Sequence, residues 1–323
     1  MQKHHGFIYR LCLLALVVVA FCAWTTVALA TGLVDGLGRQ VVIEQAPERI
    51  ITLPVWAAEM LLEMVGSERI IAVSAWGDDP AVSPTSELAA AVPERVSSDN
   101  AEGILALAPD LVVLDTFSAG FDGGLVRTLE EAGLTVLVMA SPTDINTVMY
   151  ALTMLGEATA AQEQAAQMVA DMQGVLATVA IGLSKVPQGG FKTMMFYEGS
   201  FEHADMLCAY GPGTTLDAIA RAAGLINVCD APNFSPVSKE KIVAEWKPEV
   251  LIVRSSTMDE NWVMNDDGGI ANIAAVLADP VLAGLPAVQN QMVFAISDRY
   301  RDSQSHYIVR AVYELAKLLY PIE

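Results

Sequence analysis

Short apolar runs rich in β-branched residues alternate with helical patterns along the chain, and this alternation constrains the fold more than any other feature. Residues 49–53 and 70–73 have the character of buried strands, and 57–65 between them has the pattern of a helix. Parallel strands need such crossovers, so the alternation predicts a parallel sheet and an α/β fold. Further strands are expected at 111–114, 135–138, 193–197, 250–253 and 292–296, and further helices at 100–108, 124–132, 144–155, 215–223 and 303–319.

The alternation is interrupted between residues 157 and 183. Here Met168, Met172 and Val179 fall at helical spacing, and glutamines and acids fill the other face. We therefore predict one long amphipathic helix that bridges two Rossmann-like lobes with parallel-type sheets, with a ligand cleft between the lobes. The expected divisions are an N-terminal lobe over 31–156, a bridging helix over 157–185 and a C-terminal lobe over 186–323.

The first 30 residues have the pattern of a secretory signal peptide. Basic residues precede an apolar run over 11–24, and Ala28-Leu29-Ala30 has the small-x-small pattern of a cleavage site. We expect cleavage after Ala30 and a periplasmic location. An uncleaved anchor remains an alternative, whereas the bulk of Phe21 disfavours lipid attachment at Cys22. No later stretch reads as long and apolar enough to cross a bilayer.

The charge of the chain bears on its partners, and its cysteines bear on whether it holds a disulfide. Asp and Glu number 38 against 18 Lys and Arg, a formal net charge of −20, which argues against nucleic acid as a partner. Cys208 and Cys229 flank the expected helix over 215–223. In an exported protein they could form a disulfide or remain two buried thiols, and the sequence leaves both open.

The common motifs of catalysis and metal binding are missing from the sequence. It contains no Gly-x-Ser-x-Gly, no Gly-x-x-x-x-Gly-Lys, no His-Glu-x-x-His and no Cys-x-x-Cys. Beyond the signal peptide only His203 and His306 could supply imidazole ligands, and they lie far apart in sequence. We therefore expect no catalytic residues, no metal ligands and no cofactor, and the sequence points away from an enzyme.

Candidate ligand-binding residues follow the predicted strands, because ligands of open α/β sheets bind beyond the carboxyl ends of the strands. Aromatic and arginine side chains gather there, which suits a bulky, partly apolar ligand with acidic edges. Each of them could instead pack within the protein, and Trp246 and Trp262 are expected to do so. The candidates are Trp56, Trp76, Phe117, Tyr197, Tyr210, Arg254, Arg299, Tyr300 and Arg301.

Several stretches, taken in their order, resemble the periplasmic substrate-binding proteins of ABC importers for iron–siderophores, haem and cobalamin. The resemblance covers roughly residues 33–321. The stretches that carry it are 34–39 with 47–51, 100–113, 238–253 and 315–321.

The resemblance implies two lobes joined by one rigid helix, a metal chelate held in the cleft, and delivery to a membrane permease by a monomer. It also implies one docking glutamate on each lobe, at Glu102 and Glu240, although both could be ordinary first-turn helix acids. Haem-binding members of the family often supply an axial Tyr or His, and Tyr197, Tyr210 or Tyr300 could serve. An oxyanion such as molybdate is an alternative ligand, and an exported α/β enzyme or a surface adhesion module are alternative functions.

Overall fold

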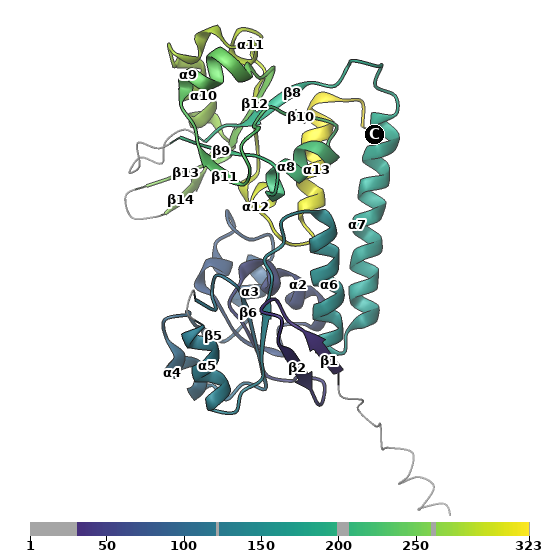
Figure 1. The fold of residues 1–323 in the computed structure, drawn as a ribbon, viewed down its shortest axis with the longest axis vertical. Coiled ribbons are helices and arrows are strands. Elements are labelled where there is room, and N and C mark those ends of the chain that lie inside the picture. Colours follow the sequence, from purple (N-terminus) through teal and green to yellow (C-terminus); the bar gives the residue numbers. More distant parts are fainter. Residues whose placement is uncertain (1–30, 121–122, 199–206, 260–262, 323) are drawn as a thin grey trace, which may run out of the picture.

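The computed structural model describes residues 31–120, 123–198, 207–259 and 263–322 and shows two lobes with one long helix, α7 (Gln162–Leu183), running beside both (Figure 1). The expected signal peptide lies outside the described residues. The mixed α/β architecture with parallel sheets in two lobes confirms the predicted fold class.

The N-terminal lobe is built on a five-stranded sheet in which every neighbouring pair is parallel. Its strand order is β5 (Glu94–Arg95), β4 (Ile70–Val73), β3 (Ile50–Thr52), β6 (Leu111–Asp115) and β7 (Val136–Met139). An antiparallel hairpin, β1 (Thr31–Val34) and β2 (Gln40–Ile43), precedes the sheet. The helices are α2 (Val55–Val65), the 3₁₀ turn η1 (Ala75–Asp78), α3 (Ser86–Ala90), α4 (Ala101–Ala106), α5 (Gly124–Glu131) and α6 (Ile145–Thr159).

The C-terminal lobe repeats this plan with four parallel strands, in the order β10 (Ile226–Asn227), β8 (Thr193–Phe196), β12 (Val250–Arg254) and β15 (Val293–Ile296). Two antiparallel strand pairs extend it, β9 (Cys208–Tyr210) with β11 (Phe234–Pro236) and the hairpin of β13 (Ser256–Met258) with β14 (Met264–Asp266). Its helical segments are α8 (Thr215–Ala222), α9 (Lys239–Lys241), the π-helical η2 (Ile242–Trp246), α10 (Ile270–Ala278), η3 (Leu282–Gly284), α11 (Pro286–Gln289), α12 (Asp298–Arg301) and α13 (Ile308–Leu319).

Each parallel sheet has a point where the chain reverses the direction in which strands are added. In the N-terminal lobe this point lies between β3 and β6, and in the C-terminal lobe between β8 and β12. Crevices form at the carboxyl ends of the strands at such switch points. The topology therefore marks the residues after β3, β6, β8 and β12 as the walls of a site.

Helix α7 begins later than the sequence pattern predicts. Residues 157–159 belong to α6, because Ala160 adopts a left-handed conformation with φ of 55° and turns the chain before Gln162. Met172 and Val179 are buried on the inner face of α7, as their spacing predicts, in a core cluster that includes residues of both lobes. That cluster also contains apolar residues of α2, α6, α8 and α13, so packing as well as the chain joins the lobes.

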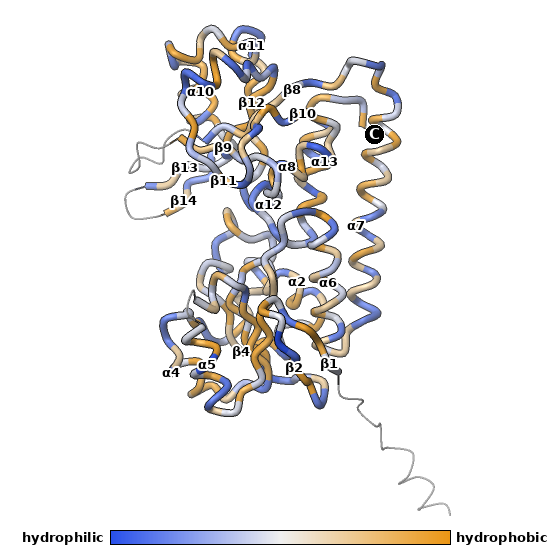
Figure 2. The backbone as a smooth tube through the Cα atoms, viewed as in Figure 1, coloured by the Kyte–Doolittle hydropathy of each residue, from blue (hydrophilic) through white to orange (hydrophobic). Residues whose placement is uncertain are grey.

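Helix α7 is also long and apolar enough in composition to span a membrane, which corrects the expectation that no segment after the N-terminus is. Its inner face contacts α6 and α13. Figure 2 shows hydrophobic and hydrophilic residues alternating along it.

Two expectations about local structure have clear outcomes. The predicted starts of the helices at 100 and 144 are confirmed to within one residue, because Asn100 caps α4 by accepting a hydrogen bond from the Gly103 amide, and Asp144 with Thr147 forms a capping box at α6. The last helix predicted over 303–319 is confirmed over Ile308–Leu319, but it starts five residues later than predicted, and the short α12 before it ends at Arg301. The intervening residues 302–307, here called the strap, make hydrogen bonds to the other lobe instead.

Candidate ligand-binding cleft

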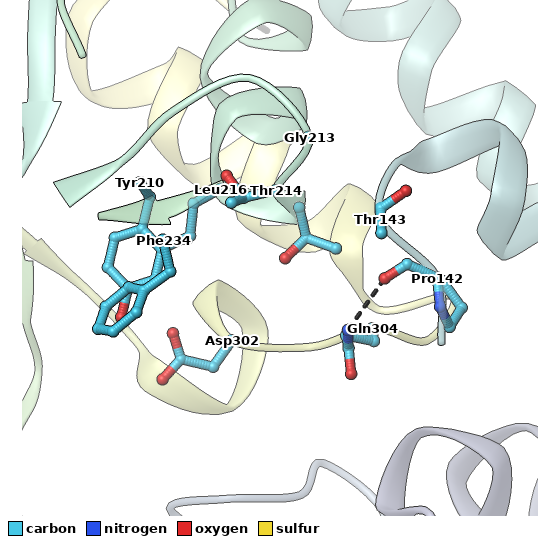
Figure 3. Close-up of a pocket in the computed structure, with 10 residues that line it drawn as sticks. Pro142, Thr143, Tyr210, Gly213, Thr214, Leu216, Phe234, Asp302 and Gln304 are labelled. Carbon is cyan, nitrogen blue, oxygen red and sulfur yellow. Dashed lines mark hydrogen bonds between the residues drawn. The ribbon is translucent and has the colours of Figure 1, made fainter. Parts of the chain in front are cut away.

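The two lobes enclose two adjoining pockets. Asp302 and Gln304 line both of them, so the pockets are two halves of one cleft. The tryptophan pocket, of about 310 Å³, has Trp56 and Trp76 on the N-terminal wall and Arg254, Met258 and Met264 on the C-terminal wall. The tyrosine pocket, of about 320 Å³, lies between Pro142 and Thr143 on one side and Tyr210 and Phe234 on the other (Figure 3).

The N-terminal wall is anchored at the switch point of its sheet. Trp56 lies in the first turn of α2, just after β3, and its indole Nε1 donates to the Asp115 carboxylate at the end of β6, over 3.5 Å. Ser118 and Ser141 also donate to Asp115, which fixes the carboxylate that holds the indole. Trp56 is therefore a buried, oriented wall residue, with 5% of its surface exposed.

Trp76 is the exposed aromatic of the tryptophan pocket. It lies on η1 after β4, and 55% of its surface remains accessible. A tryptophan face left open to a pocket offers a large apolar contact area to a flat ligand.

The C-terminal wall carries a buried charge cluster at the switch point between β8 and β12. The Arg301 guanidinium is fully buried and lies 2.6 Å from Glu198 and 2.6 Å from Asp302. Arg254 lies 3.2 Å from Glu198 and 2.7 Å from Asp302. The Tyr210 hydroxyl donates to the second oxygen of Glu198 over 2.7 Å, so Glu198 is the centre of the cluster.

Burial and charge act in opposite directions on this cluster. Burial opposes ionisation of Glu198, but the charges of Arg301 and Arg254 outweigh it and hold the pKa of Glu198 below its usual value. Burial and the nearby Glu198 raise the pKa of Tyr210, so this phenol remains protonated at neutral pH. Glu198 is therefore an ionised carboxylate between two guanidiniums, with a neutral tyrosine donor beside it, whereas burial raises the pKa of Asp298.

Two features connect the lobes across the floor of the cleft. Glu59 of α2 lines the tryptophan pocket and accepts hydrogen bonds from the Ser303 and Ser305 hydroxyls of the strap. Burial raises the pKa of Glu59 to about 7. One turn further along α2, Glu63 lies 2.9 Å from His306 Nε2, and this hydrogen bond lowers the pKa of Glu63.

The structure brings four of the predicted residues to the cleft: Trp56, Trp76, Tyr210 and Arg254. Arg301 lies behind the wall, where its partners occupy it. Arg299 stacks on Tyr300 at 5.1 Å, and Tyr300 packs beside Tyr307, both outside the two described pockets.

Tyr197 and Phe117 are also placed outside the described pockets. Tyr197 is buried in a different core cluster, beside Lys239 and Asp279. Phe117 is 82% exposed on the N-terminal lobe.

Sequence reasoning missed several lining residues. Met258 and Met264 pair across the β13–β14 hairpin, and Phe234 stacks at 5.0 Å on Tyr210 across β9 and β11. Neither pairing was predicted. Helix α8 and strand β10 lie between β9 and β11 in the chain, and β13 and β14 are three residues each and mostly polar, without an alternating apolar run. Asp302 had an available signal, since it directly follows the arginine pair that was singled out.

The glutamates singled out for docking are both exposed at helix starts. Glu102 lies in the first turn of α4, and Glu240 in the first turn of α9. Hydrogen bonds from its own backbone amide and from Ser238 lower the pKa of Glu240. Helices α4 and α9 lie one on each lobe, on the side of the molecule away from α7 (Figure 1).

The cysteine alternatives are decided by the structure. Cys208 and Cys229 are both buried and both free. Burial raises the pKa of each thiol, which keeps the thiolate form scarce.

Comparison with known proteins decides the family. Residues 50–300 match the family described as periplasmic binding protein. The chain belongs to this family. Members of the periplasmic binding protein family are binding proteins with the two-lobed architecture described above.

Two relatives indicate how far the similarity extends. A cobalamin-binding protein of Halobacterium salinarum is 25% identical over 222 residues, 68% of this chain and 57% of that protein. This chain therefore spans little more than half the length of that relative. The uncharacterized ABC transporter substrate-binding lipoprotein YvrC of Bacillus subtilis is 20% identical over 300 residues, 89% of this chain and 84% of YvrC.

Solved structures of other periplasmic binding proteins share the fold. A periplasmic binding protein from Veillonella parvula superposes with a TM-score of 0.74 at 18% identity, covering 93% of this chain and 99% of that chain. The periplasmic heme-binding protein RhuT from Roseiflexus has a TM-score of 0.66 at 21% identity, covering 84% and 97%.

Proposed function

We propose that this protein captures a metal chelate outside the cytoplasm and delivers it to the permease of an ABC importer, without chemical change to the chelate. The observation that carries the proposal is the interlobe cleft. Trp56 and Trp76 form one wall of it, and Met258 and Met264 the other. Aromatic rings and thioethers on opposite walls suit a broad, flat, polarisable ligand.

The size of the cleft supports a ligand of this class. The lining of the two pockets runs from Trp76 in one to Phe234 in the other, and Asp302 and Gln304 line both. Volumes of this order fall at the lower end of the range for drug-sized ligands, and a shallow two-part cleft holds a disc-shaped molecule better than a compact ion. The relatives named for cobalamin or haem are consistent with this class of ligand.

An oxyanion such as molybdate is less compatible with the charges of the cleft. A small anion needs unoccupied donors, and the guanidinium of Arg254 already faces three carboxylates. We therefore favour a chelate over an oxyanion.

Export is part of the proposal. The N-terminal 30 residues have the pattern of a signal peptide cleaved after Ala30. The sequence of the N-terminus of the secreted protein tests this, and a chain that retains Met1 would contradict it.

Titration of the purified protein with cyanocobalamin, haemin and a ferric hydroxamate tests the binding function. We expect one of them to raise the melting temperature, quench tryptophan fluorescence and be recovered with its absorption spectrum unchanged. Conversion of the chelate to a product would instead favour an exported enzyme. If none of the three binds, the proposed ligand class is wrong.

A further inference from the structure

The cationic side chains of the cleft wall are already occupied by carboxylates of the same lobe. Each guanidinium nitrogen of Arg254 faces a carboxylate: Nη2 lies 2.7 Å from Asp302, Nη1 3.2 Å from Glu198, and Nε 3.3 Å from Asp298. Arg301 is fully buried and shares Glu198 and Asp302. A ligand carboxylate that bound Arg254 would have to displace one of these partners.

The charge balance of this cluster is negative. Two guanidiniums face three carboxylates, Glu198, Asp298 and Asp302, and all five groups come from the C-terminal lobe. Asp298 is further held by the amides of Ser255 and Ser256, so it is a fixed part of the wall. Across the cleft, the titratable side chain that the N-terminal lobe contributes to the described lining of the tryptophan pocket is another acid, Glu59.

Asp302 presents this negative charge to the ligand. It lines both pockets, and 38% of its side chain is exposed. Figure 3 shows it between the Tyr210–Phe234 pair and Gln304. The Gln304 amide nitrogen donates to the Pro142 carbonyl over 2.9 Å, which leaves its amide oxygen as an acceptor for a ligand.

We infer that the cleft selects chelates whose rim carries neutral hydrogen-bond donors, such as carboxamides, over chelates whose rim carries carboxylates. The inference rests on the proposed function and specifies its ligand class. A rim amide can donate to Asp302 and to Gln304, whereas a rim carboxylate would be desolvated beside a cluster of net negative charge. The net charge of −20 on the chain acts against polyanions in the same direction. This replaces the acidic-edged ligand that the arginines suggest from sequence alone.

Matched pairs of chelates that differ only in rim charge test the inference. Haemin is compared with its bis-carboxamide, and cobyrinic acid with its heptaamide, so that each neutral member carries the amide donors that the inference requires. Cyanocobalamin is the naturally amide-rimmed corrinoid. Dissociation constants are measured by tryptophan quenching of the wild-type protein, and we expect the uncharged member of a bound pair to bind roughly tenfold more tightly.

Removing the charge of Asp302 should reduce the ratio of dissociation constants between the acidic and the neutral member of a pair. In Asp302→Asn the acidic member should gain about fivefold in affinity, because the Arg254 nitrogen loses an ionised partner and the cluster becomes neutral. Asp171→Asn is the matched control, since it removes the same charge from exposed helix α7, outside the cleft. It should leave the ratio as in the wild type.

The outcomes distinguish failure of the rim selectivity from failure of the proposed chelate-binding function. If the acidic member of either pair binds wild-type protein as tightly as the neutral one or more tightly, the inference is overturned, and the chelate-binding function stands. If no member of either pair and no cyanocobalamin binds, the proposed function fails and the inference fails with it.

Discussion

Trp76 is the residue whose proposed contact with the ligand is easiest to test by substitution. Because 55% of its surface is exposed in the unliganded protein, Trp76→Ala removes little packing and should leave the melting temperature nearly unchanged. It should weaken chelate binding by about 1 kcal/mol, roughly five- to tenfold in Kd, and remove part of the fluorescence quench. Titration of the variant with the tightest-binding chelate measures both effects.

Phe117→Ala is the control for this experiment. Phe117 is even more exposed, at 82%, but lies outside the two described pockets. We expect its affinity to match that of the wild type. A loss of affinity in Phe117→Ala as large as in Trp76→Ala would mean that the ligand lies elsewhere on the N-terminal lobe.

Glu59 should make the stability of the protein depend on pH. Its pKa is about 7 in the fold against an ordinary 4.5, so the folded state binds more protons between these values. The free energy of unfolding should therefore fall as pH rises from about 4.5 to 7, by a total of about 3 kcal/mol, and then level off. Denaturant unfolding at a series of pH values measures the slope.

Glu59→Gln isolates this effect from other groups. The variant keeps a polar side chain that the strap serines can bond, but it does not titrate. The hydrogen bond with His306 lowers the pKa of Glu63, so Glu63 changes the free energy of unfolding below its ordinary pKa and not between pH 4.5 and 7. The difference in free energy of unfolding between the wild type and Glu59→Gln should fall as pH rises from 4.5 to 7. Parallel pH profiles for the two proteins would contradict the assignment of this pH dependence to Glu59.

At the scale of elements, replacing alanine by glycine should have opposite effects on the free energy of unfolding in the α6–α7 turn and within α7. Ala160 is held at φ 55° and ψ 40°, a left-handed conformation that a Cβ disfavours, so Ala160→Gly should stabilise the protein by about 1 kcal/mol. Ala166 is exposed within α7, where Ala166→Gly should destabilise by about 1 kcal/mol. Urea unfolding of both variants compares the two, and destabilisation by Ala160→Gly would show that the turn is not strained.

Most of the regular elements could be predicted from sequence, because local signals specify them. The run 111–114 is apolar throughout and became β6, and Asp144 with Thr147 fixed the start of α6. The pairing of β9 with β11 could not be predicted, because α8 and β10 lie between them in the chain, and the β13–β14 hairpin could not, because both strands are short and mostly polar. The break at residues 302–307 was missed because contacts with Glu59 in the other lobe, not local propensity, decide it.

The positions of some site residues could be predicted from strand order, whereas their partners and orientations depend on residues far away in sequence. The switch-point rule places Trp56 and Arg254 at the cleft from the order of strands alone. It does not show that Arg254 is paired, because Glu198 and Asp302 come from segments about fifty residues away on either side. Nor does it decide orientation within Arg299-Tyr300-Arg301, where the turn of α12 buries one arginine and leaves the other on a tyrosine ring.

At the scale of the whole molecule, a continuous core and α7 join the two lobes, and each lobe carries one exposed docking candidate, Glu102 or Glu240. If Glu102 and Glu240 contact the permease, the double variant Glu102→Ala with Glu240→Ala should bind chelate normally and keep its melting temperature. Uptake, or stimulation of the permease ATPase, should fall sharply, because the contacts on both lobes are lost. Normal transport by the double variant would show that both are ordinary helix acids.

The central claim is that the chelate sits between the lobes. Crystals grown with the chelate that binds most tightly allow its metal to be located by anomalous scattering at the absorption edge of that metal. We expect one peak per chain inside the cleft, between Trp76 of η1 and the Met258–Met264 pair of the β13–β14 hairpin. A bound metal located outside the cleft, with the space between Trp76 and the methionines filled only by solvent, would contradict the claim.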